Sequence, residues 1–235
     1  MYLLVLISFF SCTKEESDHV AESQEYELLF YRFKDGVVRH FLNVALGTEY
    51  GTGFQVTQKW TSEMNIFIGG NPSAEMLSEL NLIKEEVNTY ATDGFSMNIV
   101  NDSLQSNFYL FFGPPDGYVE LFPEQGIIID DNNNGLFHIN MNSNFEIISG
   151  HMFVNIDISN SERRKHILRE ELTQSLGLSN DVLFNRNSIF YYGISSLTSY
   201  DGIDIEIIRL LYHPNMRSGL DRNMAEFSCR SILGI

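Results

Sequence analysis

Apolar residues recur every three or four positions in four stretches of the chain, and this spacing predicts four amphipathic helices. The third has clear boundaries, because Ser159 and Glu162 are spaced as a capping box. At its other end, Gly177 followed by Leu178 is typical of a Schellman stop. The predicted helices cover residues 35–47, 72–90, 159–176 and 198–213.

Shorter stretches are rich in β-branched and aromatic residues, or alternate between apolar and polar positions, and these predict strands. No internal repeat and no break in composition divides the part of the chain that holds these elements. We therefore expect a single α+β domain over residues 26–235. The predicted strands cover residues 64–68, 95–100, 107–112, 118–122, 127–129, 136–141 and 145–156, with a turn at 113–117.

The N-terminal residues differ from this pattern and predict a sorting signal. The apolar run from Tyr2 to Phe10 is too short to span a bilayer and has the length of a signal-peptide core. Its end at Ser11 and Cys12 resembles the lipobox of bacterial lipoproteins, which implies acylation of Cys12. We therefore expect an anchored protein of the cell envelope, held in the outer membrane. A cleaved secretory signal is the alternative.

Residues 13–25 are polar and predict a disordered tether between the anchor and the domain. Lys14-Glu15-Glu16 within it resembles the surface-export signal of some Gram-negative lipoproteins, which implies exposure at the cell surface. No other stretch approaches the ~20 apolar residues of a membrane-spanning helix. Contact with the membrane is therefore expected only through the lipid.

Composition excludes several functions. The 31 Asp and Glu outnumber the 15 Lys and Arg, giving a formal net charge of −16, which opposes nucleic-acid binding. Two cysteines exclude a disulfide-rich scaffold and a Cys-rich zinc module, and Cys229 is expected to be a lone thiol. Residues 130–135 resemble the first half of an EF-hand loop, but Met141 stands where a bidentate Glu is required, so we interpret them as a turn.

The most informative stretch lies in the third predicted helix. Leucines at 168, 172 and 176 form one apolar stripe, while His166, Glu170 and Gln174 follow each other at steps of four on another face. Glu171 stands between the two stripes. By itself this pattern also fits an amphipathic helix with a solvated polar face.

This helix resembles the zinc motif of the metzincin metalloproteases, H-E-x-x-H-x-x-G-x-x-H-D. The Glu171 position, the Gly177 turn and a trailing Asp181 are present, whereas Glu170, Gln174 and Asn180 stand where the family has its three histidine ligands. Residues 188–192 resemble the Met-turn, and residues 197–212 the closing helix. The resemblance implies a zincin-like fold, with a mixed twisted sheet packed on a central motif helix and a second long helix. It also implies that Glu171 would be the general base on a metal-bound water.

A further resemblance covers residues 38–220. The chain is similar to a bacterial lipoprotein-like family, domain-of-unknown-function family 2927, which shares the pattern from His166 through Asp181. The match also includes the stretches at 41–51, 60–61, 188–190 and 211–214. The family has no assigned activity, so this resemblance indicates the fold and leaves the function open.

The replaced ligands leave more than one function open. Zinc prefers imidazole or thiolate, and the amides of Gln174 and Asn180 are poor ligands. Our first hypothesis is a non-catalytic binding protein, a pseudoenzyme that holds a peptide or an envelope polymer in the former substrate groove. The alternative is a metal-dependent hydrolase, a peptidase, with zinc held by a rearranged set that includes His166 and Glu170. A structural lipoprotein without a ligand is the third possibility.

The two main hypotheses give Glu171 different roles. In a peptidase its carboxylate is the base. In a binding protein it is expected to be partly buried and held by backbone N–H groups near Ser188 or by the hydroxyls of Tyr191 and Tyr192. We favour the structural role, because three replaced ligands leave no metal-bound water to activate. We also expect Glu170 and Gln174 to face the groove, with Asn180 turning back toward them.

Overall fold

The computed structural model describes residues 13–47, 54–127, 129 and 133–235, with side chains from Leu28 onward. The predicted sorting signal with Cys12, and residues 130–132 of the Asp-rich loop, lie outside the described residues. In chain order the elements are α1 (Thr13–Val44), β1 (Lys59–Trp60), β2 (Met64–Gly70), α2 (Ala74–Tyr90), β3 (Met97–Val100), η1 (Ser103–Gln105), β4 (Phe108–Phe112), α3 (Pro115–Leu121), η2 (Pro123–Ile127), β5 (Gly135–Met141), β6 (Glu146–Val154), α4 (Ser161–Gln174), α5 (Gly202–Leu211) and α6 (Arg222–Leu233).

The strands form one sheet in which β3, β2, β4 and β6 are parallel neighbours in that order. β5 pairs antiparallel with β6, and the two residues of β1 pair parallel with the first two of β6. Alternate residues of β4, at 108, 110 and 112, are fully buried, as expected for a strand with a core-facing side. The predicted mixed sheet is confirmed.

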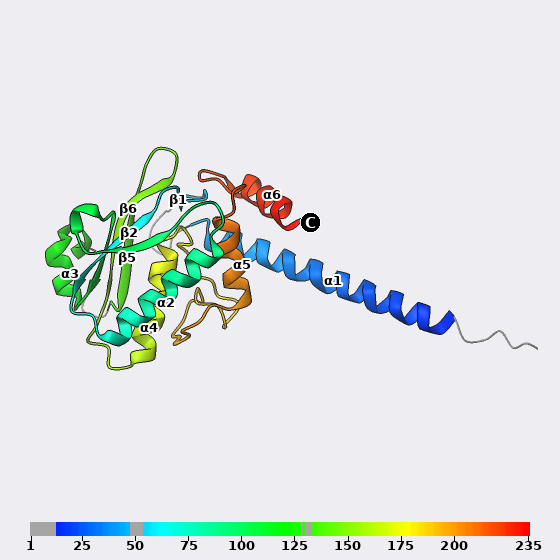
Figure 1. The fold of residues 1–235 in the computed structure, drawn as a ribbon, viewed down its shortest axis with the longest axis horizontal. Helices are drawn as coiled ribbons and strands as arrows, with labels where there is room; N and C mark the ends of the chain where they lie inside the picture. Colours follow the sequence, from blue (N-terminus) through cyan, green and yellow to red (C-terminus); the bar gives the residue numbers. More distant parts are fainter. Residues whose placement is uncertain (1–12, 48–53, 128, 130–132) are drawn as a thin grey trace, which may run out of the picture.

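Helices α2 and α4 pack against each other and against the sheet (Figure 1). The leucine stripe of α4 is fully buried, which places this helix in the centre of the domain. Behind its end, the indole N–H of Trp60 donates to the carbonyl oxygen of Ser175 at 3.0 Å. The order of strand, helix, strands, motif helix and closing helix α5 agrees with the order that the metzincin resemblance implies.

Three helices differ from the sequence-based prediction. α1 begins at Thr13 and includes residues 13–25, where we predict a tether; these residues contain no Gly or Pro, and Glu, Lys and Gln are good helix formers. α3 occupies residues predicted as a turn and a strand, because Pro115 at its first position presets the helical φ and Tyr118 is buried by one turn of helix. α6 was not predicted. Similarly, Ile127, predicted to begin a strand, is the last residue of the 3₁₀ helix η2.

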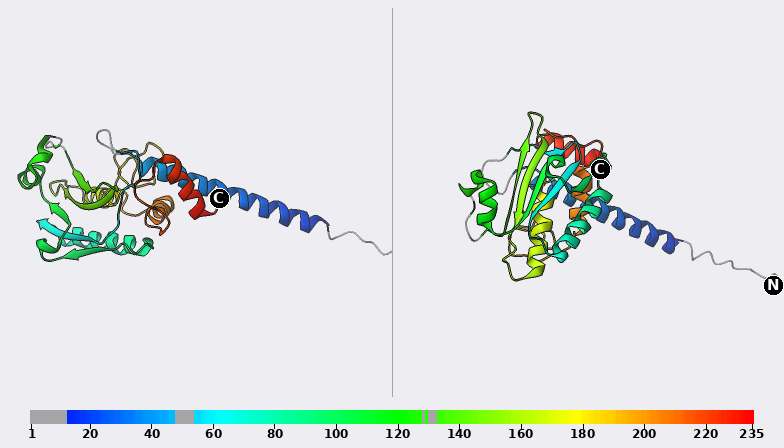
Figure 2. Two further views of the ribbon diagram at one scale, coloured as in Figure 1. Left: turned by 90° about the horizontal axis from the view of Figure 1, so that it is seen from above. Right: turned by 60° about the vertical axis from the view of Figure 1, so that its left-hand side comes forward.

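α1 projects from the body as a long helix, and only its C-terminal part packs against α5 and α6 (Figures 1 and 2). Burial begins at Val37. The turns just outside the body carry apolar side chains that are about half exposed, between 49% and 57%: Leu28, Leu29, Phe30, Tyr31 and Phe33. No helix within the described residues combines the length and apolar character needed to cross a bilayer.

Candidate functional site

A pocket of about 390 Å³ opens beside the C-terminal half of α4. One wall is the chain entering β5, the other is the loop after α4, and α4 supplies the floor. The lining combines three carboxylates with one cation, Arg163, whose guanidinium donates to the carbonyl oxygen of Ser195 at 2.7 Å. The lining residues are Asn133, Asn134, Gly135, Arg163, Ile167, Glu170, Glu171, Asp181, Tyr192, Gly193 and Ile194.

Glu171 is partly buried in this pocket, packed against the first residue of β5. A Cβ atom on Gly135 would lie 3.1 Å from Cγ of Glu171 and 2.4 Å from the Ile167 side chain, so the absence of a side chain at Gly135 makes room for both. The negative charge of Glu171 also reaches the buried Tyr118: burial raises the pKa of this phenol most, and Glu171 and Glu124 raise it further. Glu171 is therefore a charged component of the pocket wall.

The turn at Ser188 is held by the carboxylate of Asp204, at the start of α5. Its Oδ1 accepts a hydrogen bond from Ser188 Oγ at 2.6 Å and its Oδ2 one from the backbone N–H of Ile189 at 3.1 Å. Asp204 belongs to a capping box with Asp201, a sequence pattern that could have indicated a structural carboxylate here.

His40 completes a buried group with Ser188 and Asp204, but the three do not form a nucleophilic triad. Ser188 Oγ donates directly to Asp204, whereas a triad serine would donate to the histidine. None of the three side chains is exposed, so no substrate reaches the hydroxyl. Their role is to hold the turn at Ser188 against α1, through His40, and against α5, through Asp204.

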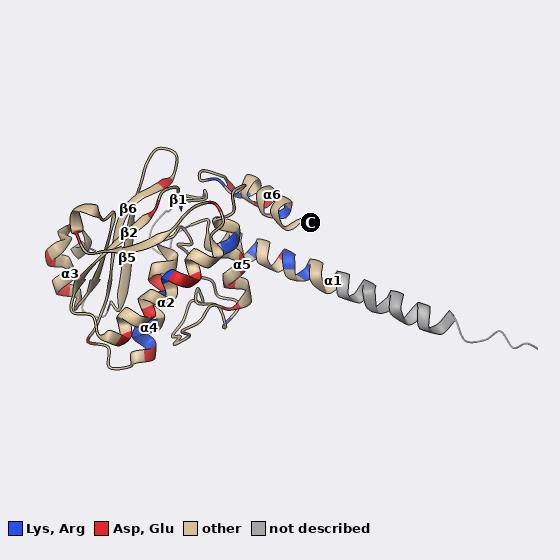
Figure 3. Cartoon of the chain, in the orientation of Figure 1, with Lys and Arg blue, Asp and Glu red and all other residues tan. Residues whose placement is uncertain are grey.

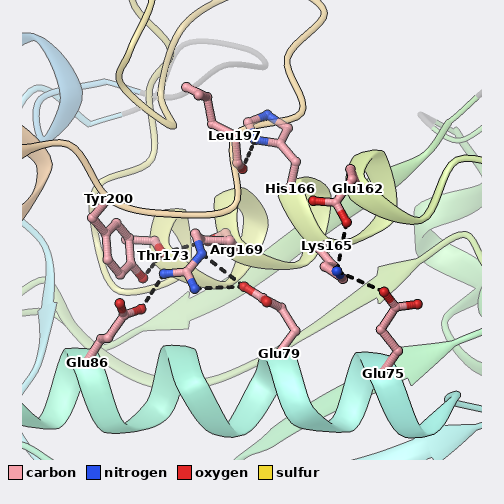
Figure 4. Close-up of polar contacts among 10 residues, drawn as sticks. All are labelled: Glu75, Glu79, Glu86, Glu162, Lys165, His166, Arg169, Thr173, Leu197 and Tyr200. Atoms are coloured by element: carbon pink, nitrogen blue, oxygen red, sulfur yellow. Dashed lines mark hydrogen bonds and ion pairs between the residues drawn. The ribbon is translucent and has the colours of Figure 1, made fainter.

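His166 and Glu170 lie together on α4. His166 is fully buried, and its Nδ1 must carry the proton, because it lies 2.8 Å from the carbonyl oxygen of Leu197 (Figure 4). Its Nε2 lies 3.2 Å from Oε2 of Glu170 but makes no well-aligned hydrogen bond. Glu170 lines the pocket, as expected, while His166 stands behind it.

Gln174 and Asn180 do not line the pocket, and they point to different partners. Gln174 Nε2 donates to Oδ1 of Asp181 at 2.7 Å, and its buried Oε1 has no hydrogen-bond partner. Asn180 Nδ2 donates to the carbonyl oxygen of Asn43 at 2.8 Å, so its side chain fastens the end of α1. Gln174 thus orients a pocket carboxylate, and Asn180 connects two elements.

These contacts test whether the residues present fit the zinc ion that the fold implies. Zinc needs three good protein ligands that converge on one point. Here Glu170 is turned to His166, Gln174 to Asp181 and Asn180 to α1. Within the described part of the chain, no group of three His, Cys, Asp or Glu side chains is arranged to hold a metal ion. The donor set at the motif positions does not fit zinc.

The opposite side of α4 is fixed by a buried ion cluster. The fully buried Arg169 donates to Glu79 at 2.7 Å and to Glu86, both on α2 (Figure 4). Its guanidinium also lies over the ring of Tyr200, 4.6 Å from the centroid. The pocket therefore lies on a helix whose opposite side is anchored to α2 by this cluster.

Acidic residues are spread over the body, including α2, α3 and α4, whereas the part of α1 near the body carries Lys and Arg (Figure 3).

A comparison with known protein families supports one of the resemblances found in the sequence. The model of the family described as "Protein of unknown function (DUF2927)" matches residues 34–228. Among solved structures, myroilysin is similar over 68% of this chain and 97% of its own, with 15% identity and a TM-score of 0.39. At this score the likeness supports no inference about activity. No curated protein matches the sequence.

Proposed function

The chain belongs to the family of proteins of unknown function DUF2927, and we propose that its body is a non-catalytic domain that binds extended peptides beside α4. The observation that carries this proposal is the division of roles at the motif. Two of the metal-ligand positions make structural hydrogen bonds, Gln174 to Asp181 and Asn180 to the end of α1. Three carboxylates, Glu170, Glu171 and Asp181, line a pocket.

The walls of the pocket indicate the class of ligand. Among the described strands, β5 pairs only with β6, which leaves its other edge available for a strand of a partner. Gly135, the first residue of β5, lines the pocket, so a peptide along this edge would bring a side chain to it. Three carboxylates favour a Lys or Arg side chain there. Tyr192 and Ile194, 60% and 97% exposed, offer apolar contact on the opposite wall.

Binding of fluorescent decapeptides to the purified protein, measured by anisotropy, tests this function. A peptide with a central Arg should bind, and Asp181→Asn should weaken it about tenfold, because the charge is lost and the shape is kept. Glu85→Gln is the matched control, since this carboxylate on α2 is 71% exposed and outside the pocket. Equal affinity of the wild type and Asp181→Asn would contradict the proposal. If the protein binds an envelope polymer and not the peptides, the ligand of the pocket is such a polymer and not a peptide.

The sequence adds an anchor to this proposal. Because the apolar run ends at Ser11-Cys12, we propose that Cys12 is acylated and holds the domain in the outer membrane, exposed at the cell surface. Metabolic labelling with an alkyne fatty acid should mark the wild type and not Cys12→Ser. Equal labelling of the two would exclude the anchor.

One observation favours a second function, the metal-dependent hydrolase. Two buried acceptors without a hydrogen-bond partner, Nε2 of His166 and Oε1 of Gln174, lie one turn of α4 on either side of Glu170. Metal analysis of the purified protein distinguishes the two functions. About one zinc per chain, lost in His166→Ala, would replace the first proposal. Peptidase activity lost in Glu171→Gln at an unchanged melting temperature would give Glu171 the role of the base. If the protein binds neither peptides nor a metal ion, the remaining possibility is a structural lipoprotein without a ligand.

A further inference from the structure

A second pocket, of about 630 Å³, lies on elements that the first does not use. It is lined by residues at the start of β1, after α2, in the β5–β6 turn and between α5 and α6. Its volume is within the ~300–1,000 Å³ of typical small-molecule sites. Two cations, Lys59 and Arg217, and two carboxylates, Asp93 and Glu146, line it together with three hydroxyl side chains, Thr61, Ser143 and Ser218.

The buried part of this pocket is built around Lys59. Its ammonium group, on a side chain only 5% exposed, donates to Oδ2 of Asp93 at 2.5 Å and to the carbonyl oxygen of Met216 at 3.2 Å. Asp93 is held in turn by the backbone N–H of Phe95. The same ammonium lies 5.2 Å from the ring centroid of Tyr212. Because Asp93 balances its charge, Lys59 gives the pocket a polar wall that does not attract anions strongly.

The rim carries a strained aromatic residue. Phe145 has a φ of +60°, a left-handed conformation that is a genuine outlier for a bulky side chain. The turn enforces it, since Oδ1 of Asn142 accepts hydrogen bonds from the backbone N–H groups of Asn144 and Glu146. The ring meets Phe54, which is 57% exposed, edge to face at 5.2 Å. Strained residues of this kind cluster at binding and active sites.

We propose that this second pocket binds a neutral oligosaccharide. Sugar rings present hydroxyls that both donate and accept, which matches a lining of balanced charges, hydroxyls and the Asn144 amide. They also present a C–H face that packs on aromatic rings, which Phe145 supplies at the rim. A phosphate or another strong anion is disfavoured, because the two carboxylates offset the two cations and the whole chain carries −16.

Isothermal titration of the full chain with neutral tetrasaccharides of glucose, galactose, mannose and N-acetylglucosamine, each at millimolar concentration, tests the inference. At least one should bind. Phe145→Gly should weaken that sugar about tenfold or more, because the stacking surface is lost. Its melting temperature should stay equal or rise, because glycine adopts the left-handed conformation without strain. Arg217→Ala, at an exposed side chain, should weaken binding without affecting folding.

The controls separate this site from the peptide pocket. Asp181→Asn should leave sugar affinity unchanged, and so should Phe227→Ala, which removes a 75% exposed ring on α6 outside the pocket. The absence of binding to all four tetrasaccharides would overturn the inference. Binding that survives both Phe145→Gly and Arg217→Ala would also overturn it, because the sugar would then sit elsewhere. Neither result bears on the peptide pocket.

Discussion

Arg169 is a fully buried cation placed between two carboxylates of the neighbouring helix α2. Its guanidinium satisfies Glu79 with two N–H groups and Glu86 with a third, and it packs on Tyr200. The hydroxyl of Tyr200 also lies 2.8 Å from Thr173 Oγ1. Removing one partner of a buried ion cluster leaves uncompensated charge in the interior, which costs far more than the loss of a surface pair.

We therefore expect Arg169→Met to lower the free energy of unfolding by about 3–5 kcal/mol, because two carboxylates lose their counter-charge. Urea denaturation followed by circular dichroism measures it. The matched control is Arg209→Ala, whose side chain is 53% exposed and pairs with Glu206; it should cost at most about 1 kcal/mol. Similar losses in the two variants would show that the cluster around Arg169 is solvated.

His151 gives the fold a pH dependence. The ring is stacked on Phe122 at 3.8 Å, and its Nδ1 lies 2.6 Å from the hydroxyl of Tyr118. Burial and, to a smaller extent, the neighbouring His138 lower the pKa of His151 to about 4, against the opposing effect of Glu124. The folded state thus favours the neutral ring, whereas the unfolded chain takes up a proton near the ordinary pKa of 6.5.

The direction in which pH changes the stability follows from the two pKa values of His151, in the folded and in the unfolded chain. Above pH 6.5 neither state binds the proton, and between 6.5 and about 4 only the unfolded state does. Stability should therefore fall as the pH falls through this window, by about 3 kcal/mol at most from this group. His151→Gln should have a flatter stability profile than the wild type in urea denaturation at a series of pH values. Parallel stability profiles of the wild type and His151→Gln would show that His151 does not cause the pH dependence.

At the scale of elements, the turn after α4 fixes how the motif helix meets β1. Gly177 has a φ of +110°, and a Cβ atom there would lie 2.0 Å from the carbonyl oxygen of Gln58. The backbone N–H groups of Gly177 and Leu178 both donate to the carbonyl oxygen of Gln174. The turn therefore needs glycine for its conformation and for the close approach of Gln58, the residue before β1.

Gly177→Ala should lower the free energy of unfolding by about 3 kcal/mol or more, because strain and a clash with backbone act together. Gly202→Ala is the control, since nothing lies within 4 Å of a Cβ atom there, at the first residue of α5. It should be neutral or stabilise by up to about 1 kcal/mol. The midpoint of thermal unfolding reports both. A tolerated Gly177→Ala would mean that the segment carrying Gln58 can move away.

The elements show how far the sequence predicts this fold. Periodicity predicts α2, α4, α5 and most strands, because each has one face in the same core. Its limits show at α4, where the side chain that caps the helix is Asn160 rather than Ser159. α6 was missed although Asp221 caps its start and Gly234, at a φ of 69°, ends it. Those boundary signals, together with the helical spacing of Ala225, Cys229 and Ile232, could have indicated this helix.

At the scale of the whole molecule, the candidate site depends on contacts that the sequence does not reveal. The motif led to Glu170 and Glu171 because they lie on one helix. The motif also includes Asp181, but the walls at Asn134 and at Ile194 come from segments that only the tertiary fold brings to α4. The partner of Asn180 is more distant still, since Asn43 precedes it by 137 residues. Periodicity within an element carries no information on such pairs.

The projecting part of α1 should be dispensable for the fold, because burial begins at Val37 and the family match at residue 34. Deletion of residues 1–32 should leave the melting temperature of the body unchanged. Trypsin should cut first after the exposed Arg32 and leave a stable fragment, which mass spectrometry identifies. A melting temperature lowered by several degrees would show that the outer turns of α1 support the body.

The same helix has a geometric consequence. As a continuous helix, residues 13–34 measure about 33 Å at roughly 1.5 Å per residue, close to the thickness of a bilayer core. A random coil of equal length would let the body approach the point that holds its end, whereas a stiff rod fixes the distance between the two. If Cys12 is acylated as proposed, the body would meet partners at about this distance from the anchored residue.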